Sequence, residues 1–204
     1  MDLLFFLDDK LRFIERHYDR AVEPFATVKR RIENGEPPYE PDTDYDSGED
    51  EPPFTPEWIE ADESENIVGY SCLGLVQGVL LEYLREYLRQ RGLSLPSGKG
   101  GLLQRYRDFF KVQLGIAWDD SPVAFETLED VAMARNHIQH ETNITSRFAQ
   151  QSDNYAQRFP MSLFGGNFRE IRVTDESLKA AISAVEAFCT FIEHQKESRS
   201  SLNM

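Results

Sequence analysis

The amino-acid sequence predicts an all-α protein, an up-and-down bundle of four to five helices with a disordered acidic insertion. Two observations support this fold class. Apolar residues recur every three or four positions in several segments, which is typical of amphipathic helices. One segment instead combines prolines and acidic residues with almost no periodic apolar residues. The chain has 204 residues, which is enough for one domain with a core of ordinary size.

The first expected element is an amphipathic helix over residues 1–33 that packs on the bundle. Its apolar residues follow one another at spacings of three and four: Leu3, Leu7, Leu11, Ile14, Tyr18 and Val22. Pro24 is expected to kink or split this helix, because proline lacks the amide hydrogen and its ring clashes with the preceding turn. Asp2, Asp8 and Asp9 flank the first apolar run where a signal peptide would have basic residues, so no targeting segment is expected.

Residues 34–65 are expected to form a disordered linker rich in acids and proline. Between residues 32 and 65 there are 14 Asp and Glu residues and no Lys or Arg, and the segment holds six of the ten prolines. Such a composition buries too little apolar surface to offset the entropy lost on ordering. The segment is therefore predicted to be dispensable for folding, and either a regulatory or an inert role stays open. Outside it the chain is neutral, with 22 acidic and 22 basic residues.

Residues 66–195 are expected to form the main helical domain, followed by a flexible tail over 196–204. Helices are predicted over 66–91, 102–114 and 122–140, and a final helix is predicted after Thr174. Thr174 is a good capping residue, and the final helix has a continuous apolar face. A short strand is possible over 168–173.

The expected location is the cytoplasm, with no membrane crossing. Cys72 and Cys189 are far apart in apolar helical stretches, whereas secreted small domains use dense, paired cysteines. The most apolar stretch, residues 67–81, is shorter than a bilayer span and is interrupted by small and polar residues.

The residues most suggestive of chemistry are Arg135, Asn136 and His140, which stand at the end of the third predicted helix of the main domain. Cleavage of a phosphodiester without metal needs a group that moves a proton near neutral pH, and imidazole does so. It also needs a fixed positive charge on the phosphoryl oxygens, and guanidinium supplies planar, permanently charged donors. His140 suits the first role and Arg135 the second, while Asn136 can orient the imidazole or a phosphate oxygen. No cofactor and no metal are expected.

This arrangement resembles the signature of the HEPN superfamily, in which an Arg is followed by a small polar residue and then by a His after four to six intervening residues. Here four residues separate Arg135 and His140, and Asn136 fills the polar position. The resemblance implies a helical bundle and a metal-independent endoribonuclease of toxin–antitoxin or phage-defence systems, with RNA as substrate. It also implies a cognate antitoxin or nucleotidyltransferase partner. Some HEPN toxins have a Tyr two residues after the His, where their partner modifies them, but this chain has Thr142.

A homodimer is expected from helical geometry. Two residues five positions apart on an ideal helix are splayed by about 140°. Arg135 and His140 of one copy therefore do not readily converge on one phosphate. Two copies that face each other across a twofold axis can bring them together, and this matches the composite dimer site of the HEPN family.

Other interpretations stay open. One alternative is a HEPN-fold binding or scaffolding module for a protein partner or nucleotide, and another is an adaptor that binds through its acidic segment. A histidine at a helix end is also stabilised there by the helix dipole without any function. His137, His140 and Glu141 could hold a metal, although no further ligand has suitable spacing. A basic stretch over 85–111 with interleaved tyrosines could stack bases or could be an ordinary solvated surface.

Overall fold

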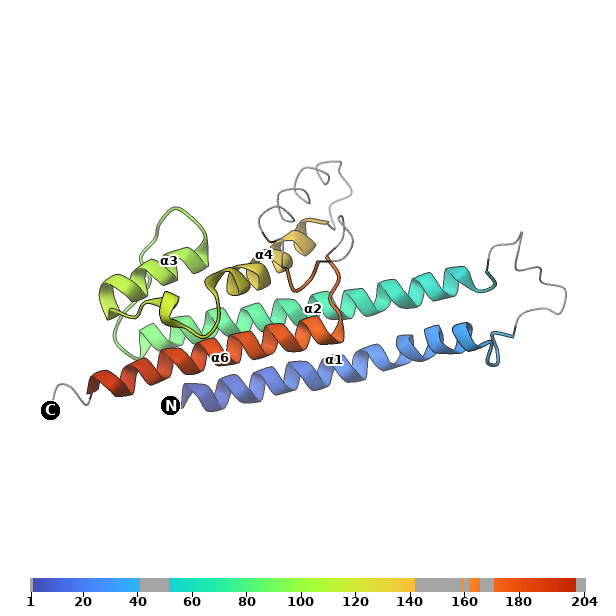
Figure 1. Ribbon diagram of the computed structural model, residues 1–204, viewed down its shortest axis with the longest axis horizontal. Helices are drawn as coiled ribbons and strands as arrows, with labels where there is room; N and C mark the ends of the chain where they lie inside the picture. The colour runs from blue at the N-terminus through green and yellow to red at the C-terminus, as the bar shows by residue number, and fades with distance from the viewer. Residues whose placement is uncertain (1, 41–51, 142–158, 160–161, 166–170, 201–204) are drawn as a thin grey trace.

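In the computed structural model, residues 2–40, 52–141, 159, 162–165 and 171–200 are described, with 136–141 and 196–200 described by their backbone alone. These residues form five α-helices and no strand, which confirms the predicted all-α class (Figure 1). The helices are α1 (Leu3–Asn34), α2 (Thr55–Arg89), α3 (Leu102–Phe109), α4 (Phe125–Glu141) and α6 (Asp175–Ser200). Two shorter turns, η1 (Phe110–Leu114, π-helical) and η2 (Trp118–Asp120, 3-10), connect α3 to α4.

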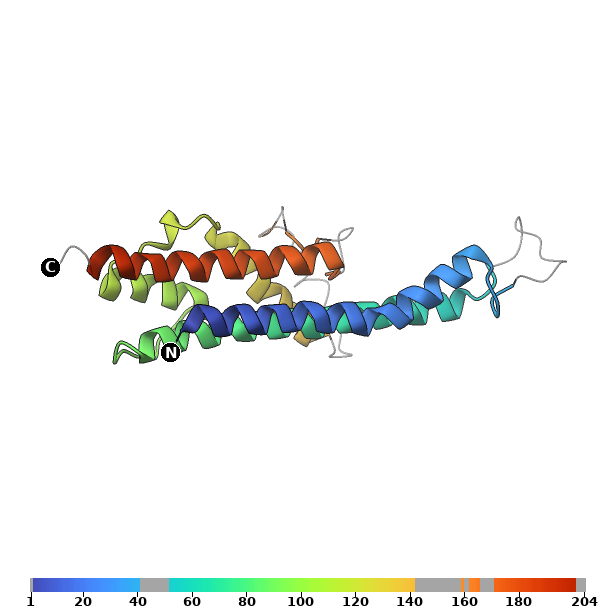
Figure 2. The ribbon, with the colours of Figure 1, turned by 90° about the horizontal axis from the view of Figure 1, so that it is seen from below.

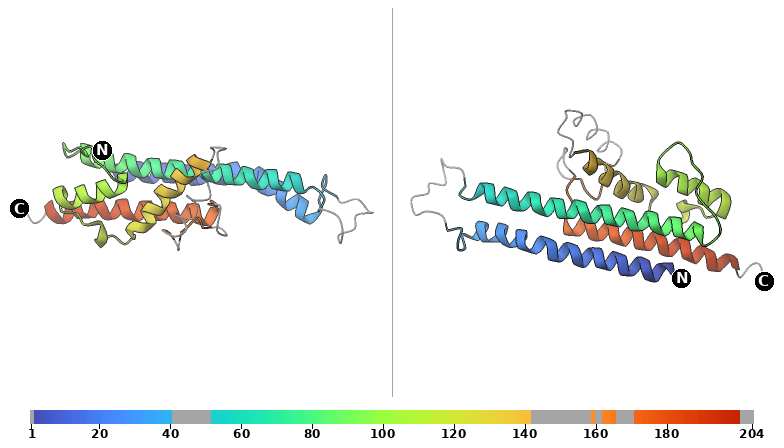
Figure 3. Two further views of the ribbon diagram at one scale, coloured as in Figure 1. Left: turned by 90° about the horizontal axis from the view of Figure 1, so that it is seen from above. Right: turned by 180° about the vertical axis from the view of Figure 1, so that it is seen from behind.

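The architecture is a long antiparallel hairpin of α1 and α2 with the other helices packed on one half of it. Helix α6 lies along both α1 and α2 and runs antiparallel to α1 (Figure 1). Helix α4 crosses the direction of α2 and also contacts α6 (Figure 3). The loop-side half of the hairpin extends beyond the start of α6, so the hairpin forms an arm on the bundle (Figure 1).

Helix α1 has the expected caps at both ends. The Asp2 carboxylate accepts a hydrogen bond from the Phe5 amide at 3.1 Å, and the helix ends at Gly35 with a left-handed φ of 61°. Glycine adopts that conformation without steric cost. Pro24 lies inside the helix and does not split it. Figure 2 shows that α1 changes direction in the half that contains Pro24, as expected for a proline kink.

Helix α2 begins at Thr55, not near residue 66. Residues 55–65 are therefore helical, and the prediction that they belong to a disordered linker was wrong. Pro56 stands in the first turn, where proline is favourable, and acidic residues suit the positive end of the helix dipole. Contacts with α1 explain why this acidic segment folds. Lys29 bonds Asp62 at 2.6 Å and Glu65 at 3.0 Å, and it lies over the Trp58 ring at 4.8 Å from the ring centroid. Residues 41–51 of the predicted insertion lie outside the described residues.

Asp62 connects three parts of the chain, because its carboxylate pairs with both Lys29 of α1 and Arg172, which precedes α6. Burial raises the pKa of Asp62, but the hydrogen bonds from Lys29 and Arg172 outweigh it and hold the pKa below its ordinary value of 3.8. A depressed carboxyl pKa contributes stability above the ordinary pKa that is lost as pH falls through the folded-state pKa.

We therefore expect Asp62→Asn to lower the free energy of unfolding by about 2 kcal/mol at neutral pH, because two cations lose a shared, partly buried partner. The difference from the wild type should shrink steadily in acid, where the wild-type carboxyl is itself protonated. Urea unfolding at about pH 7 and about pH 3 measures both values. A difference that is the same at the two pH values would show that the ion pairs contribute nothing.

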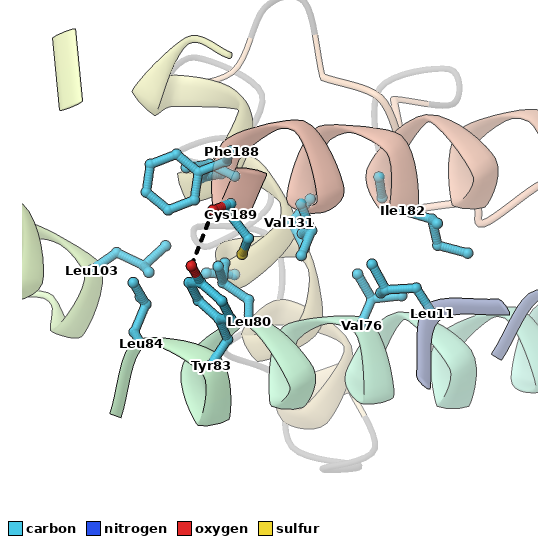
Figure 4. Packing of buried hydrophobic residues seen from close by; sticks show 14 of the residues in the cluster. Leu11, Val76, Leu80, Tyr83, Leu84, Leu103, Val131, Ile182, Phe188 and Cys189 are labelled. Atoms are coloured by element: carbon cyan, nitrogen blue, oxygen red, sulfur yellow. Dashed lines mark hydrogen bonds between the residues drawn. The ribbon is translucent and has the colours of Figure 1, made fainter. Parts of the chain in front are cut away.

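The core is continuous from α1 to α6 and includes a cluster of aromatic rings. Trp118 is 2% exposed and packs edge-on against Phe188 at 4.6 Å and Phe110 at 5.6 Å between ring centroids. Figure 4 shows side chains of α2, α4 and α6 meeting between the helices, with the Tyr83 hydroxyl donating to the Cys189 carbonyl at 3.0 Å. The cluster joins η1, η2 and α6 and thereby fixes where α4 begins.

Helix α2 includes an 18-residue window that is long and apolar enough, by length and composition alone, to cross a membrane. In this bundle α2 is the central helix, and Cys72, Leu73, Val76 and Leu80 are fully buried in the core. That position explains much of its hydropathy. Only 44% of the window is buried, however.

The remaining boundaries differ in detail from the predictions. The expected 102–114 helix is α3 followed by the η1 turn, and α4 begins at Phe125, after Pro122 rather than at it. Thr174 caps α6 as predicted, since its hydroxyl accepts from the Ser177 amide at 3.2 Å. Within the described part of 168–173, only a single bridge between Gly165 and Ile171 is present. Helix α6 extends to Ser200, so residues 196–200 are helical and not a flexible tail.

Candidate functional site

Helix α4 presents one face to the core and ends with the motif. Leu128, Val131 and Ala134 are at most 1% exposed, and the helix packs against α2 and α6. Val131 is seen between these two helices in Figure 4. Because Ala134 is the last residue of this buried face before Arg135, the motif begins where the helix is still anchored to the core.

Arg135 is half-buried and lies against α2. Its Cγ is 3.9 Å from the position that a Cβ on Gly74 would occupy. The aliphatic stem of Arg135 therefore lies over Gly74, and arginine commonly buries its stem this way while its guanidinium reaches outward. A larger residue at Gly74 would compete with the stem for this space.

Asn136 and His140 are in the last turns of α4. Their backbone is helical as predicted, but their side chains lie outside the described residues. The helical backbone separates Arg135 and His140 by the five positions from which the splay of about 140° was expected. Convergence of the two side chains on one phosphate stays a prediction.

Asp130 is a site residue that the sequence reasoning missed. Its side chain is on α4, is 3% exposed, and accepts hydrogen bonds from the Ser162 hydroxyl at 2.9 Å and the Leu163 amide at 2.8 Å. A buried carboxylate is costly unless it is hydrogen-bonded in this way. Asp130 therefore ties residues 162–165 to α4, five positions before Arg135.

The chain then returns to α2 through residues 171–173. The Tyr70 hydroxyl donates to the Ile171 carbonyl at 2.6 Å. Gly69 is in direct contact with Val173, because a Cβ at Gly69 would be 2.8 Å from both the Cβ and the carbonyl oxygen of Val173. The Asp130 bonds therefore hold residues 162 and 163 on α4, and the contacts of Gly69 and Tyr70 hold residues 171–173 on α2.

The tyrosines of the basic stretch over 85–111 are not a base-stacking surface. Tyr83, Tyr87 and Tyr106 are between 1% and 5% exposed, and the hydroxyls of Tyr83 and Tyr87 donate to carbonyls of α6. Arg91 covers the Tyr87 ring at 3.4 Å. The three tyrosine rings belong to the core, so base stacking by them is excluded.

A cavity of about 670 Å³ lies where α1 and α2 meet the start of α6. Its charged lining includes Lys29, Asp62, Glu65 and Arg172, which pair with one another. These cations already have carboxylate partners. We therefore interpret the charged lining of the cavity as an ion-pair network that stabilises the fold. Among the described side chains, no group of three His, Cys, Asp or Glu residues is placed to hold a metal ion. The side chains of His137, His140 and Glu141 lie outside that set.

The chain matches no protein-family model, no curated protein and no solved structure.

Proposed function

We propose that this protein is a metal-independent endoribonuclease of the HEPN type, a toxin or phage-defence component that cleaves RNA at a site built from Arg135, Asn136 and His140. The supporting observation is the position of Arg135. It follows directly on the buried face of α4, its stem lies over Gly74, and its guanidinium is permanently charged. A cation on a stem that the core positions can stabilise a phosphoryl transition state.

The reaction follows from these groups. An imidazole removes the proton from the 2′-hydroxyl, and the 2′-oxygen attacks the adjacent phosphorus. The bond from phosphorus to the 5′-oxygen breaks, and that oxygen receives a proton. The products are a 2′,3′-cyclic phosphate and a 5′-hydroxyl end. Arg135 neutralises the charge on the non-bridging oxygens, and His140 carries the proton from the 2′-oxygen to the 5′-oxygen. Asn136 orients the imidazole or a phosphate oxygen.

The proposal includes a cytoplasmic homodimer and a regulatory partner such as an antitoxin or nucleotidyltransferase. Thr142 stands where some HEPN toxins have a modifiable tyrosine. Neutralisation through a tyrosine at that position is therefore not proposed.

Purified protein incubated with single-stranded RNA in excess EDTA tests the activity. We expect cleavage to persist in EDTA, to leave cyclic phosphate ends, and to fall by about a hundredfold or more in His140→Ala, since general acid–base groups contribute about 10² to 10⁴-fold. His17→Ala, on the distant helix α1, is the matched control and should cleave normally. Absence of cleavage by the wild type would favour a non-catalytic binding or scaffolding module.

A further inference from the structure

Helix α2 has one outward stripe that runs nearly its whole length. Its residues follow one another at spacings of three and four, and all are exposed: Glu57, Glu60, Glu63, Ile67, Ser71, Leu75, Gly78, Glu82, Arg85 and Arg89. We call these ten residues the outer stripe. Spacings of three and four place them on one face of the helix. The stripe has an acidic end, a middle of apolar and small residues, and an end with two arginines.

The charges of the outer stripe are nearly symmetric about Gly74. Glu63 and Arg85 are each eleven residues from Gly74, which corresponds to about 16 Å along the helix. Glu60 and Arg89 are 14 and 15 residues away. An antiparallel pair of α2 helices that crosses at the level of Gly74 therefore places Glu63 and Glu60 of one copy opposite Arg85 and Arg89 of the other. A parallel pair would place like charges together.

Apolar side chains are exposed in the middle of the stripe and on the helix beside it. Ile67 is 62% and Leu75 is 46% exposed, and on the neighbouring α1 Phe6 is 47% and Phe13 is 56% exposed. Phe6 lines a groove with Val79 and Glu82 of α2. Together these four side chains expose roughly 400 Å². A standard interface covers about 800 Å² per partner, of which somewhat more than half is apolar, so the area fits one such interface.

The centre of the stripe also permits close approach. A Cβ added at Gly78 would meet nothing within 4 Å, and Ser71 is the residue two turns away on the same face. Small residues at a helix crossing allow the backbones to come near each other. Because the stem of Arg135 lies over Gly74, a twofold axis at this crossing places the Arg135 residues of both copies beside it.

We propose that the outer stripe is a self-association surface, on which α2 of a second copy packs antiparallel, with the twofold axis between Ser71 and Gly78 at the level of Gly74. The proposal extends the proposed function, because it brings the two motif-bearing ends of α4 to the same axis. It also explains why a helix with a membrane-like window has only 44% of that window buried within one chain.

A charge-exchange experiment on the full chain tests this surface by sedimentation equilibrium. Glu60→Lys/Glu63→Lys and Arg85→Glu/Arg89→Glu should each raise the dimer Kd about a hundredfold, because each puts four like-charged contacts across the twofold axis. An equal mixture of the two variants should regain dimers, since the reversed ends complement each other. Arg89 pairs with Glu86 within its own chain, but that exposed pair contributes little. Glu23→Lys/Glu126→Lys makes the same charge change away from the stripe and should leave the dimer intact.

Gly78→Lys gives a second readout that does not depend on charge pairing. Lysine has a better helix propensity than glycine, and the position is open, so the monomer should be at least as stable as the wild type while dimerisation is lost. A monomeric wild type at tens of micromolar would overturn the proposal, as would dimers that all these variants leave unchanged. A monomer that sediments with phosphatidylcholine vesicles would assign the stripe to a membrane and also overturn it. Dimers that respond as expected but cleave no RNA would retain the surface and reject the proposed activity.

Discussion

Arg135→Ala is expected to lower the single-turnover rate constant for RNA cleavage by about 10² to 10³-fold, the usual loss when one preorganised donor to a transition-state oxyanion is removed. The positive charge is needed as charge builds on the phosphoryl oxygens. RNA binding should weaken much less than the rate falls, because one phosphate contact among several contributes modestly to affinity.

Two further substitutions separate the charge of Arg135 from its packing. Arg135→Met keeps an aliphatic stem over Gly74 and should be more stable than Arg135→Ala, yet equally inactive. Arg135→Lys keeps the charge without the planar pair of donors and should retain an intermediate rate. The rate constant and the thermal unfolding midpoint of each variant provide the comparison. Normal cleavage by Arg135→Met would show that the residue serves only to pack α4 on α2.

Trp118→Ala is expected to lower the free energy of unfolding by about 3 to 5 kcal/mol, the range for removing a fully buried large aromatic side chain. Trp118 contacts Phe110, Phe125 and Phe188, so its loss leaves a cavity among rings from three other elements of the chain. Urea unfolding monitored by circular dichroism measures the change. Because Phe125 begins α4, the same variant should also loosen the helix that bears the motif.

The other tryptophan provides a matched control. Trp58 is only partly buried on the arm, where its indole donates to Glu33 at 2.9 Å and Lys29 lies over its ring. Trp58→Ala should cost about 1 kcal/mol, the value of an exposed cation–π contact and one surface hydrogen bond. Equal losses at the two tryptophans would contradict the placement of the core around Trp118.

The sequence was sufficient to predict the all-α class, because α1 and α6 each repeat apolar residues at helical spacing. It was misleading at the start of α2. Acids and prolines there resemble a linker, and the cations that stabilise Asp62 are far away in the chain, at Lys29 and Arg172. No local pattern shows such distant partners.

The candidate site was predictable to a similar extent. The positions of Arg135, Asn136 and His140 at the end of a helix followed from the helix predicted over 122–140. The role of Asp130 could not be predicted in this way, because a single carboxylate between apolar residues of a helix is usually solvated. Its partners Ser162 and Leu163 are more than thirty residues further along the chain.

Complementation between two inactive variants most directly tests the central claim, that Arg135 of one copy acts with His140 of the other. Arg135→Ala and His140→Ala are each expected to be inactive alone. In an equal mixture with free subunit exchange, about half of the dimers are mixed, and each mixed dimer holds one intact pair. The account predicts that the mixture regains about a quarter of the wild-type cleavage rate. A mixture with confirmed subunit exchange that stays inactive would contradict the composite site.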